Sequence, residues 1–194
     1  MGRKGLEDTV ILREAALLIS ENGFKNFSLR GLARRMKIQS ASLYNHFESM
    51  EALLTRVAWY VMEEMNQSLY RAIADKTRDE AVAALFYAYR DYVLTNPEIY
   101  RVVLSLPQSE SGTVEQAAST ITKPVEYVLK GYDITKDQAL HSQRYMRSLM
   151  HGFATLEGQG YLVHLKPKAE ESYHFIIRCV IKQLHDLEEG GKLR

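Results

Sequence analysis

Residues 28–47, SLRGLARRMKIQSASLYNHF, constrain the fold of this chain more than any other segment. Apolar residues recur at the three- and four-residue spacing of an amphipathic helix between Leu29 and Met36, and Ser28 is suited to cap its first turn. The letters KIQ then predict a tight turn, and a second short helix is expected to begin near Ser40. Two short helices joined in this way predict a helix-turn-helix motif.

The rest of the sequence predicts further helices and no β-strand. Four prolines and eleven glycines in 194 residues interrupt few segments, and a hydrophobic content of 46% suffices for a core. We expect an all-α protein of about nine helices, with a head over residues 1–48 and a body over residues 49–194. The predicted helices cover approximately residues 8–22, 29–36, 40–47, 48–74, 78–95, 97–107, 113–130, 136–159 and 167–189.

Positive charge is concentrated in the head. Residues 1–47 hold eight Lys and Arg against four Asp and Glu, a net charge of +4. Residues 48–194 hold seventeen against twenty, a net charge of −3. A basic head on a mildly acidic body is the charge distribution expected of a chain whose head contacts phosphate.

The lone Cys179 excludes a disulfide within one chain and fits a reducing compartment. It lies among apolar residues in a helical pattern, which predicts an inert core position. The N-terminal residues have no apolar signal core, and no apolar run is long enough to cross a membrane. We therefore expect a cytoplasmic protein.

Side chains suited to DNA lie in and beside the helix after Ser40. The small Ser40 and Ser42 would let its backbone approach base edges, and Asn45 could make a paired contact to adenine that discriminates by about 1–3 kcal/mol. Tyr44 and His46 are suited to phosphate oxygens. Nearby basic side chains would add attraction that weakens with salt. These side chains are Lys25, Arg34 and Arg35, whereas Arg30 could reach a phosphate or a base.

The segment from Ser28 to Leu54 resembles the DNA-binding region of the tetracycline-repressor (TetR) family of bacterial regulators, and the match covers about residues 8–55. The matching positions are Leu32, Ala33, Leu43, Tyr44, His46, Phe47, Ala52, Leu53 and Leu54. The resemblance implies roles in DNA binding for Ser28, Arg30, Ser40, Ser42, Tyr44, Asn45 and His46.

The sequence departs from the family pattern at two places, the turn at Lys37-Ile38 and Met50. Lys37 and Ile38 stand where the family usually has Gly-Val. A residue other than glycine is strained at positive φ, so we expect Lys37 to bear a modest strain or to adopt another turn geometry, while its charge would help to bind phosphate. Met50 stands where the family usually has a phosphate-binding Lys, which leaves that contact without its usual side chain.

The resemblance also implies a ligand pocket in the helices between residues 78 and 130, and a dimer-forming pair in the last two helices. Apolar residues of the last helix follow alternating steps of four and three, as in a coiled-coil seam. The predicted interface residues are Leu149, Phe153, Leu156, Tyr173, Ile177, Val180 and Leu184. The alternative is that the apolar residues of these two helices only form the core of the chain.

Aromatic side chains are concentrated in the predicted body helices, and the chain has twelve tyrosines. A tyrosine offers apolar area with a polar tip, which suits a mixed small-molecule site, although aromatic residues at helical spacing can equally form core. The candidate ligand-binding residues are Phe86, Tyr89, Tyr92, Tyr100, Tyr127, Tyr145, Met146 and His151. Met150-His151-Gly152 also resembles a C-terminal domain type of the family that is marked by Trp-His-Gly, with Met in place of Trp.

Two other classes of protein remain as alternatives. An enzyme is disfavoured, because the sequence has no glycine-rich phosphate loop, no serine flanked by glycines, and no histidines at metal-binding spacing. A helical module that binds protein or lipid would show no salt-dependent affinity for DNA, and the basic head argues against it.

We therefore predict a ligand-responsive transcriptional regulator without enzymatic activity, cofactor, metal or membrane partner. As a repressor, it would bind a near-palindromic operator as a homodimer. A small-molecule effector, which the sequence does not identify, would release it.

Overall fold

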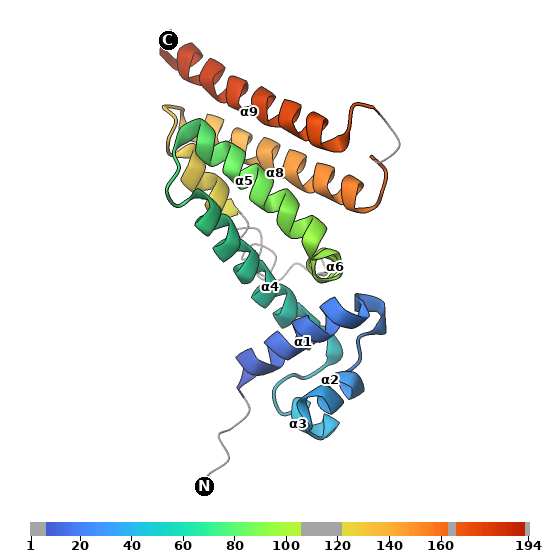
Figure 1. The fold of residues 1–194 in the computed structure, drawn as a ribbon. Coiled ribbons are helices and arrows are strands. Elements are labelled where there is room, and N and C mark those ends of the chain that lie inside the picture. Colours follow the sequence, from blue (N-terminus) through green and yellow to red (C-terminus); the bar gives the residue numbers. More distant parts are fainter. Residues whose placement is uncertain (1–6, 106–121, 163–165, 193–194) are drawn as a thin grey trace. The chain divides into compact units, whose positions relative to one another are not determined.

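The computed structural model describes residues 7–105, 122–162 and 166–192, and within these residues the chain folds into nine α-helices and one short 3-10 helix (Figure 1). The prediction of an all-α fold is confirmed. The elements are α1 (Asp8–Asn22), η1 (Phe24–Asn26), α2 (Leu29–Met36), α3 (Ser40–Leu43), α4 (Met50–Ile73), α5 (Arg78–Thr95), α6 (Pro97–Leu104), a helical segment at residues 122–129, α8 (Lys136–Gly158) and α9 (Ala169–Lys192).

Most helices begin and end where local sequence rules place them. Thr135 and Gln138 form a capping box at the start of α8, because each side chain accepts a hydrogen bond from the other residue's backbone N–H. The predicted helix over residues 113–130 lies partly outside the described residues. No described helix has the length and apolar character needed to cross a membrane.

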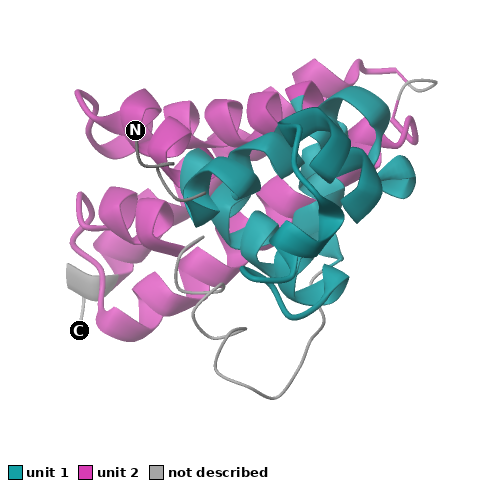
Figure 2. Cartoon of the chain, turned by 90° about the horizontal axis from the view of Figure 1, so that it is seen from below, with its two compact units in different colours: residues 1–64, 96–114 teal, residues 65–95, 115–194 magenta. Residues whose placement is uncertain are grey.

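The chain forms two compact units (Figure 2). The first comprises residues 1–64 and 96–114, and the second comprises residues 65–95 and 115–194. The boundary that we predicted after residue 48 falls just before α4, inside the first unit, and it stays a prediction.

The core of the first unit is built by α1, α2, α3 and the first half of α4. Ile11, Ile19 and Leu32 are fully buried there, and Leu43 of α3 packs into the same cluster. The helix α6 also belongs to this unit and packs on α1, with Val102 fully buried. This corrects the prediction that α6 belongs to the body. The apolar residues of a helix do not by themselves reveal which neighbouring helix they will cover.

The core of the second unit lies between α5, α8 and α9. Phe86, Met146 and Tyr173 are among its fully buried side chains. The Tyr173 hydroxyl donates a hydrogen bond of 2.8 Å to the carbonyl oxygen of Phe86, so its polar tip is satisfied inside the core.

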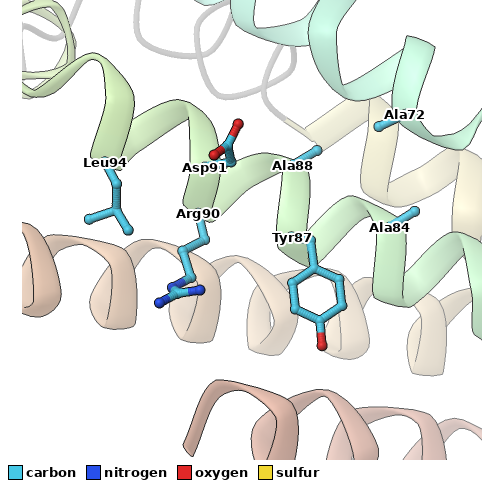
Figure 3. A pocket seen from close by; sticks show the side chains of 7 residues that line it. All are labelled: Ala72, Ala84, Tyr87, Ala88, Arg90, Asp91 and Leu94. Carbon is cyan, nitrogen blue, oxygen red and sulfur yellow. The ribbon is translucent and has the colours of Figure 1, made fainter. Parts of the chain in front are cut away.

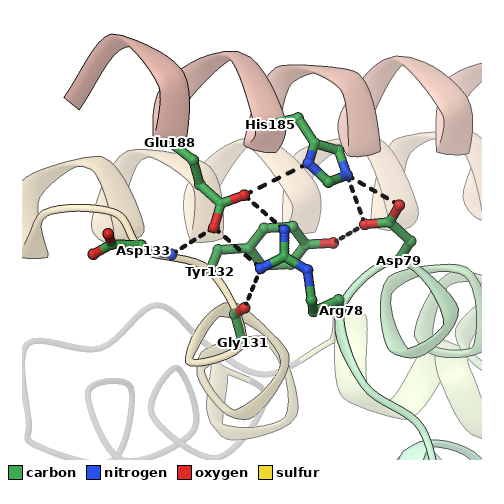
Figure 4. Close-up of polar contacts among 7 residues, drawn as sticks. All are labelled: Arg78, Asp79, Gly131, Tyr132, Asp133, His185 and Glu188. Carbon is green, nitrogen blue, oxygen red and sulfur yellow. Dashed lines mark hydrogen bonds and ion pairs between the residues drawn. The ribbon is translucent and has the colours of Figure 1, made fainter. Parts of the chain in front are cut away.

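A polar cluster in the second unit connects the start of α5 and the turn at residues 131–133 to the last turns of α9 through hydrogen bonds (Figure 4). The Arg78 guanidinium donates to both carboxylate oxygens of Glu188, at 3.1 and 2.7 Å, and to the Gly131 carbonyl at 2.8 Å. The same Glu188 carboxylate accepts from the backbone N–H of Asp133 at 2.7 Å. Because Glu188 is 8% exposed, these bonds replace the water that its charge has lost.

Replacing Glu188 with Gln should lower the free energy of unfolding by about 1–2 kcal/mol at neutral pH, because a nearly buried carboxylate loses its pairing with a partly exposed Arg78. The hydrogen bond from Arg78, followed by that from the Asp133 backbone, lowers the pKa of Glu188 from 4.5 to about 2. The stabilisation is therefore fully present above about pH 4.5 and is lost as the pH falls through about 2. Urea unfolding at a series of pH values measures the difference.

Glu189→Gln is the matched control, because Glu189 is exposed on the same turn of α9. The control should unfold like the wild type within a few tenths of a kcal/mol. Equal stabilities of Glu188→Gln and Glu189→Gln at neutral pH would show that the cluster contributes nothing to folding.

Candidate functional site

The two ends of α2 set the geometry of the helix-turn-helix. Ser28 caps the start, and its hydroxyl oxygen accepts a hydrogen bond of 3.1 Å from the backbone N–H of Gly31. At the other end Lys37 is left-handed, with φ 55° and ψ 41°. The N–H groups of Lys37 and Ile38 donate to the carbonyls of Arg34 and Ala33, at 3.1 and 3.0 Å, as in a Schellman motif. Of the two alternatives for Lys37, the structure shows the strained one.

The helix α3 is shorter than predicted, but its hydrogen bonding continues beyond Leu43. The N–H of Phe47 donates to the Leu43 carbonyl at 3.0 Å, so the chain makes one further helical turn. Leu43 and Phe47 are 1% and 5% exposed. This burial leaves Tyr44, which is 57% exposed, and Asn45 on the outside of the same turn.

The other predicted DNA-binding residues are also accessible to solvent, although the degree of exposure differs among them. Ser28, Arg30 and Lys37 are exposed, whereas Ser40 and Ser42 are half-buried. The eight predicted residues therefore lie on α2, α3 and the turns that flank them, and all retain accessible surface. Their contact with DNA stays a prediction.

The charge of Arg35 predicts attraction for DNA phosphates, but in the structure this side chain forms ion pairs within the first unit. Its Nε donates to Glu14 at 2.8 Å, and its two terminal nitrogens donate to Glu21 at 2.5 and 3.0 Å. Both carboxylates belong to α1, so Arg35 holds α2 against α1. Its charge is already neutralised and is a poor source of attraction for phosphate.

His46 is held by Asp8, which Arg56 holds in turn, and the sequence analysis missed both residues. Its Nδ1 lies 2.7 Å from Asp8 Oδ1, and Asp8 Oδ2 accepts a hydrogen bond of 2.6 Å from Arg56. The pKa of the Asp8 carboxyl is lowered, first by the hydrogen bond with His46 and then by that with Arg56. These residues lie 38 and 48 positions apart from Asp8 along the chain, so no local pattern could have joined them.

The structure separates the eight predicted ligand-binding residues rather than collecting them. Phe86, Tyr89 and Met146 are buried in the core of the second unit, whereas Tyr100 is buried in the first unit. The remaining four lie at or near the surface. Of these, Tyr127, Tyr145 and His151 are exposed and Tyr92 is half-buried.

A depression of about 450 Å³ lies along α5 in the second unit (Figure 3). Its lining residues are Ala72, Ala84, Tyr87, Ala88, Arg90, Asp91 and Leu94. None of the eight predicted residues is among them. Arg90, one of the lining residues, donates to both oxygens of Glu157 at 2.6 Å. The signal that could have found this site is the pair of alanines Ala84 and Ala88, which lie four residues apart and so share one face of α5.

The predicted dimer residues on α9 are wrongly placed for an interface. Tyr173, Ile177, Val180 and Leu184 are at most 4% exposed and pack into the core of the chain itself. The alternative reading of this stripe, as core, is therefore the one that the structure supports.

The residues that α8 and α9 expose overlap only in part with the predicted ones. Leu149 and Phe153 of α8 are half-buried, with the Phe153 ring 4.8 Å from that of Tyr173. Leu156 is 46% exposed, Phe175 of α9 is 59% exposed, and Cys179 is exposed rather than in the core. Within the described part of the chain, no His, Cys, Asp or Glu side chains group as metal ligands would.

Replacing Lys37 with Gly should stabilise the chain by about 0.5–1 kcal/mol, because glycine adopts the left-handed conformation without strain. Lys37→Ala is the matched control, since it removes the same charge but keeps a Cβ atom at positive φ. Thermal unfolding of both variants measures the difference. If the Ala variant proves as stable as the Gly variant, the left-handed backbone at this position carries no strain.

Comparison with known proteins fits this architecture. Residues 11–57 match the bacterial regulatory proteins of the tetR family, and residues 82–180 match the tetracyclin repressor-like C-terminal domain. The chain is 28% identical over 156 residues to the HTH-type transcriptional regulator YobS of Bacillus subtilis (strain 168), covering 79% of this chain and 80% of that protein. It is 30% identical over 151 residues to the HTH-type regulator Rv0681 of Mycobacterium tuberculosis (strain H37Rv), covering 77% and 69%.

Solved structures show the same fold. A protein of unknown function from Rhodococcus sp. RHA1 superposes with a TM-score of 0.74 at 23% identity, covering 95% of this chain and 98% of that one. A TetR variant from Acinetobacter baumannii AYE, in complex with minocycline, superposes with a TM-score of 0.69 at 17% identity, covering 94% and 98%. The capped α2, the α3 anchored by Leu43 and the two matched regions agree: this chain belongs to the TetR family of helix-turn-helix transcriptional regulators, which are DNA-binding proteins and not enzymes.

Proposed function

We propose that this chain is a repressor that binds a near-palindromic operator as a homodimer and leaves it when a small molecule binds the body. The observation that carries the DNA-binding part is the outer face of α3. Burial of Leu43 and Phe47 presents Tyr44 and Asn45 to solvent, and the exposed Lys37 lies in the turn before α3. Because the operator DNA lies inside the cell, the proposal includes an intracellular location for this chain.

Each side chain of this face has a distinct proposed role. Asn45 reads an adenine, while Tyr44 and His46 contact phosphate. The small, half-buried Ser40 and Ser42 allow the helix to approach the base edges. Ser28, Arg30 and Lys37 flank the groove and bind backbone phosphates, because they are exposed at the ends of α2.

The homodimer is proposed to form through the exposed residues of α8 and α9 rather than through the buried stripe. Leu156 and Phe175 present large apolar surface there, and Cys179 is exposed one turn after Phe175. Beyond the backbone of its own helix, nothing lies within 4 Å of the position where a Cβ of Gly152 would stand, so this face of α8 has room for a close neighbour. Apolar side chains of this size are costly to leave in water and favour association.

The effector is proposed to bind along α5 in the depression near Tyr87. Its volume of about 450 Å³ is in the range of small-molecule sites, and Tyr87 and Leu94 give it apolar walls. Arg90 and Asp91 supply polar groups that would orient a ligand. Such a ligand can release the protein from DNA only if it binds the two conformations with different affinity. The resemblance of residues 150–152 to a Trp-His-Gly domain type stays a prediction.

Selection of duplexes from a random-sequence pool tests the DNA-binding proposal. We expect enrichment of a near-palindromic site, with affinity that falls as salt rises. Tyr44→Ala should weaken binding across sequences, and Asn45→Ala should relax the preference at one base pair, by about 1–3 kcal/mol.

Tyr161→Ala, which truncates an exposed tyrosine in the second unit, is the control and should leave DNA binding unchanged. Absence of any enriched site would favour a helical module that binds protein or lipid. Unchanged affinity and sequence preference in both head variants would show that α3 does not contact DNA.

Phe175→Asp tests the proposed dimer. A charge on the exposed apolar face of α9 should shift the sedimentation mass from dimer toward monomer, while the far-ultraviolet circular dichroism stays that of the wild type. Leu17→Asp, at an exposed leucine of α1, is the matched control and should sediment like the wild type. A dimer that persists in Phe175→Asp would place the interface elsewhere.

A further inference from the structure

Three elements of the first unit meet at the Asp8 carboxylate. Asp8 is the first residue of α1, His46 follows α3, and Arg56 lies in the first half of α4. The carboxylate is fully engaged, because Oδ1 faces His46 Nδ1 at 2.7 Å and Oδ2 accepts from Arg56 at 2.6 Å. The Arg56 guanidinium also lies 5.2 Å from the centre of the Phe47 ring.

This geometry fixes how the imidazole is used. An ionised carboxylate only accepts hydrogen bonds, and the lowered pKa of Asp8 keeps it ionised, so Nδ1 of His46 carries the proton of the shared bond. Nε2 is the nitrogen that remains for another partner. The His46 side chain is 23% exposed and follows directly after Tyr44 and Asn45.

The charges around the ring make its protonation depend on a further anion. The charged groups that face it are Asp8 from α1 and, on the other side of that carboxylate, Arg56 from α4. With a neutral imidazole, the charges of Asp8 and Arg56 cancel. A protonated imidazole would leave the three groups with a net charge of +1, which a DNA phosphate beside Nε2 would neutralise.

We propose that Asp8 is a positioning residue for DNA binding: it fixes the His46 ring with Nε2 available to a phosphate, and phosphate binding there takes up one proton at His46. This inference rests on the proposed DNA-binding function of α3. Operator affinity therefore rises as the pH falls. Arg56 completes the arrangement by holding the second oxygen of Asp8.

The experiment uses the full chain and a duplex that the wild-type protein selects from a random-sequence pool. Fluorescence anisotropy gives the dissociation constant at about pH 6 and about pH 8, at one salt concentration and in buffers free of phosphate. For the wild type we expect binding about threefold or more tighter at the lower pH, because each linked proton can change affinity by up to about tenfold per pH unit.

Two variants should lose this pH dependence. Asp8→Asn keeps an oxygen that can accept from Nδ1 but removes the charge that supports a protonated ring. His46→Gln removes the titrating group at a partly exposed position, so it keeps the test available even if the Asn variant fails to fold. Circular dichroism verifies the fold of each. His185→Gln is the matched control, because His185 pairs with Asp79 in the second unit at 2.9 Å and should leave the pH dependence at its wild-type value.

The outcomes separate this inference from the function on which it rests. A selected duplex that the wild type binds equally at both pH values would overturn the inference alone, as would an unchanged pH dependence in Asp8→Asn and His46→Gln. Failure to select any duplex would overturn the proposed DNA-binding function together with it.

Discussion

The architecture of the head depends on the burial of Leu43 and Phe47. A helix of four residues such as α3 has no stability of its own, because the first helical turn fixes several backbone angles for a single hydrogen bond. Packing of these two side chains against α1, α2 and α4 supplies what the short helix lacks. The same packing decides which side chains face outward, so the exposure of Tyr44 and Asn45 is a consequence of the core.

Ion pairs between elements decide which charges of the head are available. Arg35 is neutralised by Glu14 and Glu21, and Asp8 holds both His46 and Arg56. A count of basic residues therefore overstates the charge that a phosphate would meet. The acidic residues of α1 take part in the same arrangement, since they fix the orientation of α2 and of the turn after α3.

In the body, one spacing of apolar residues is compatible with two kinds of packing, within one chain or between two chains. Apolar residues at alternating steps of four and three describe a helix that packs on a neighbour, whether that neighbour belongs to the same chain or to another. In α9 the stripe from Tyr173 to Leu184 packs on the chain's own core, because α5 and α8 already cover it. The predicted ligand-binding residues of the body follow the same logic: Phe86 and Met146 fill the core, and the depression along α5 is lined by other residues.

The sequence by itself determined the features that rest on neighbouring residues: the all-α fold, most of the helix bounds, the Ser28 cap and the turn at Lys37. Each of these arises from hydrogen bonds within about five positions, which local residue types specify. Only the tertiary structure decided that α6 packs on α1, that Asp8 holds His46, and that the depression lies along α5. These depend on residues far apart in the chain, whose contacts follow from how the helices pack and leave no local pattern to read.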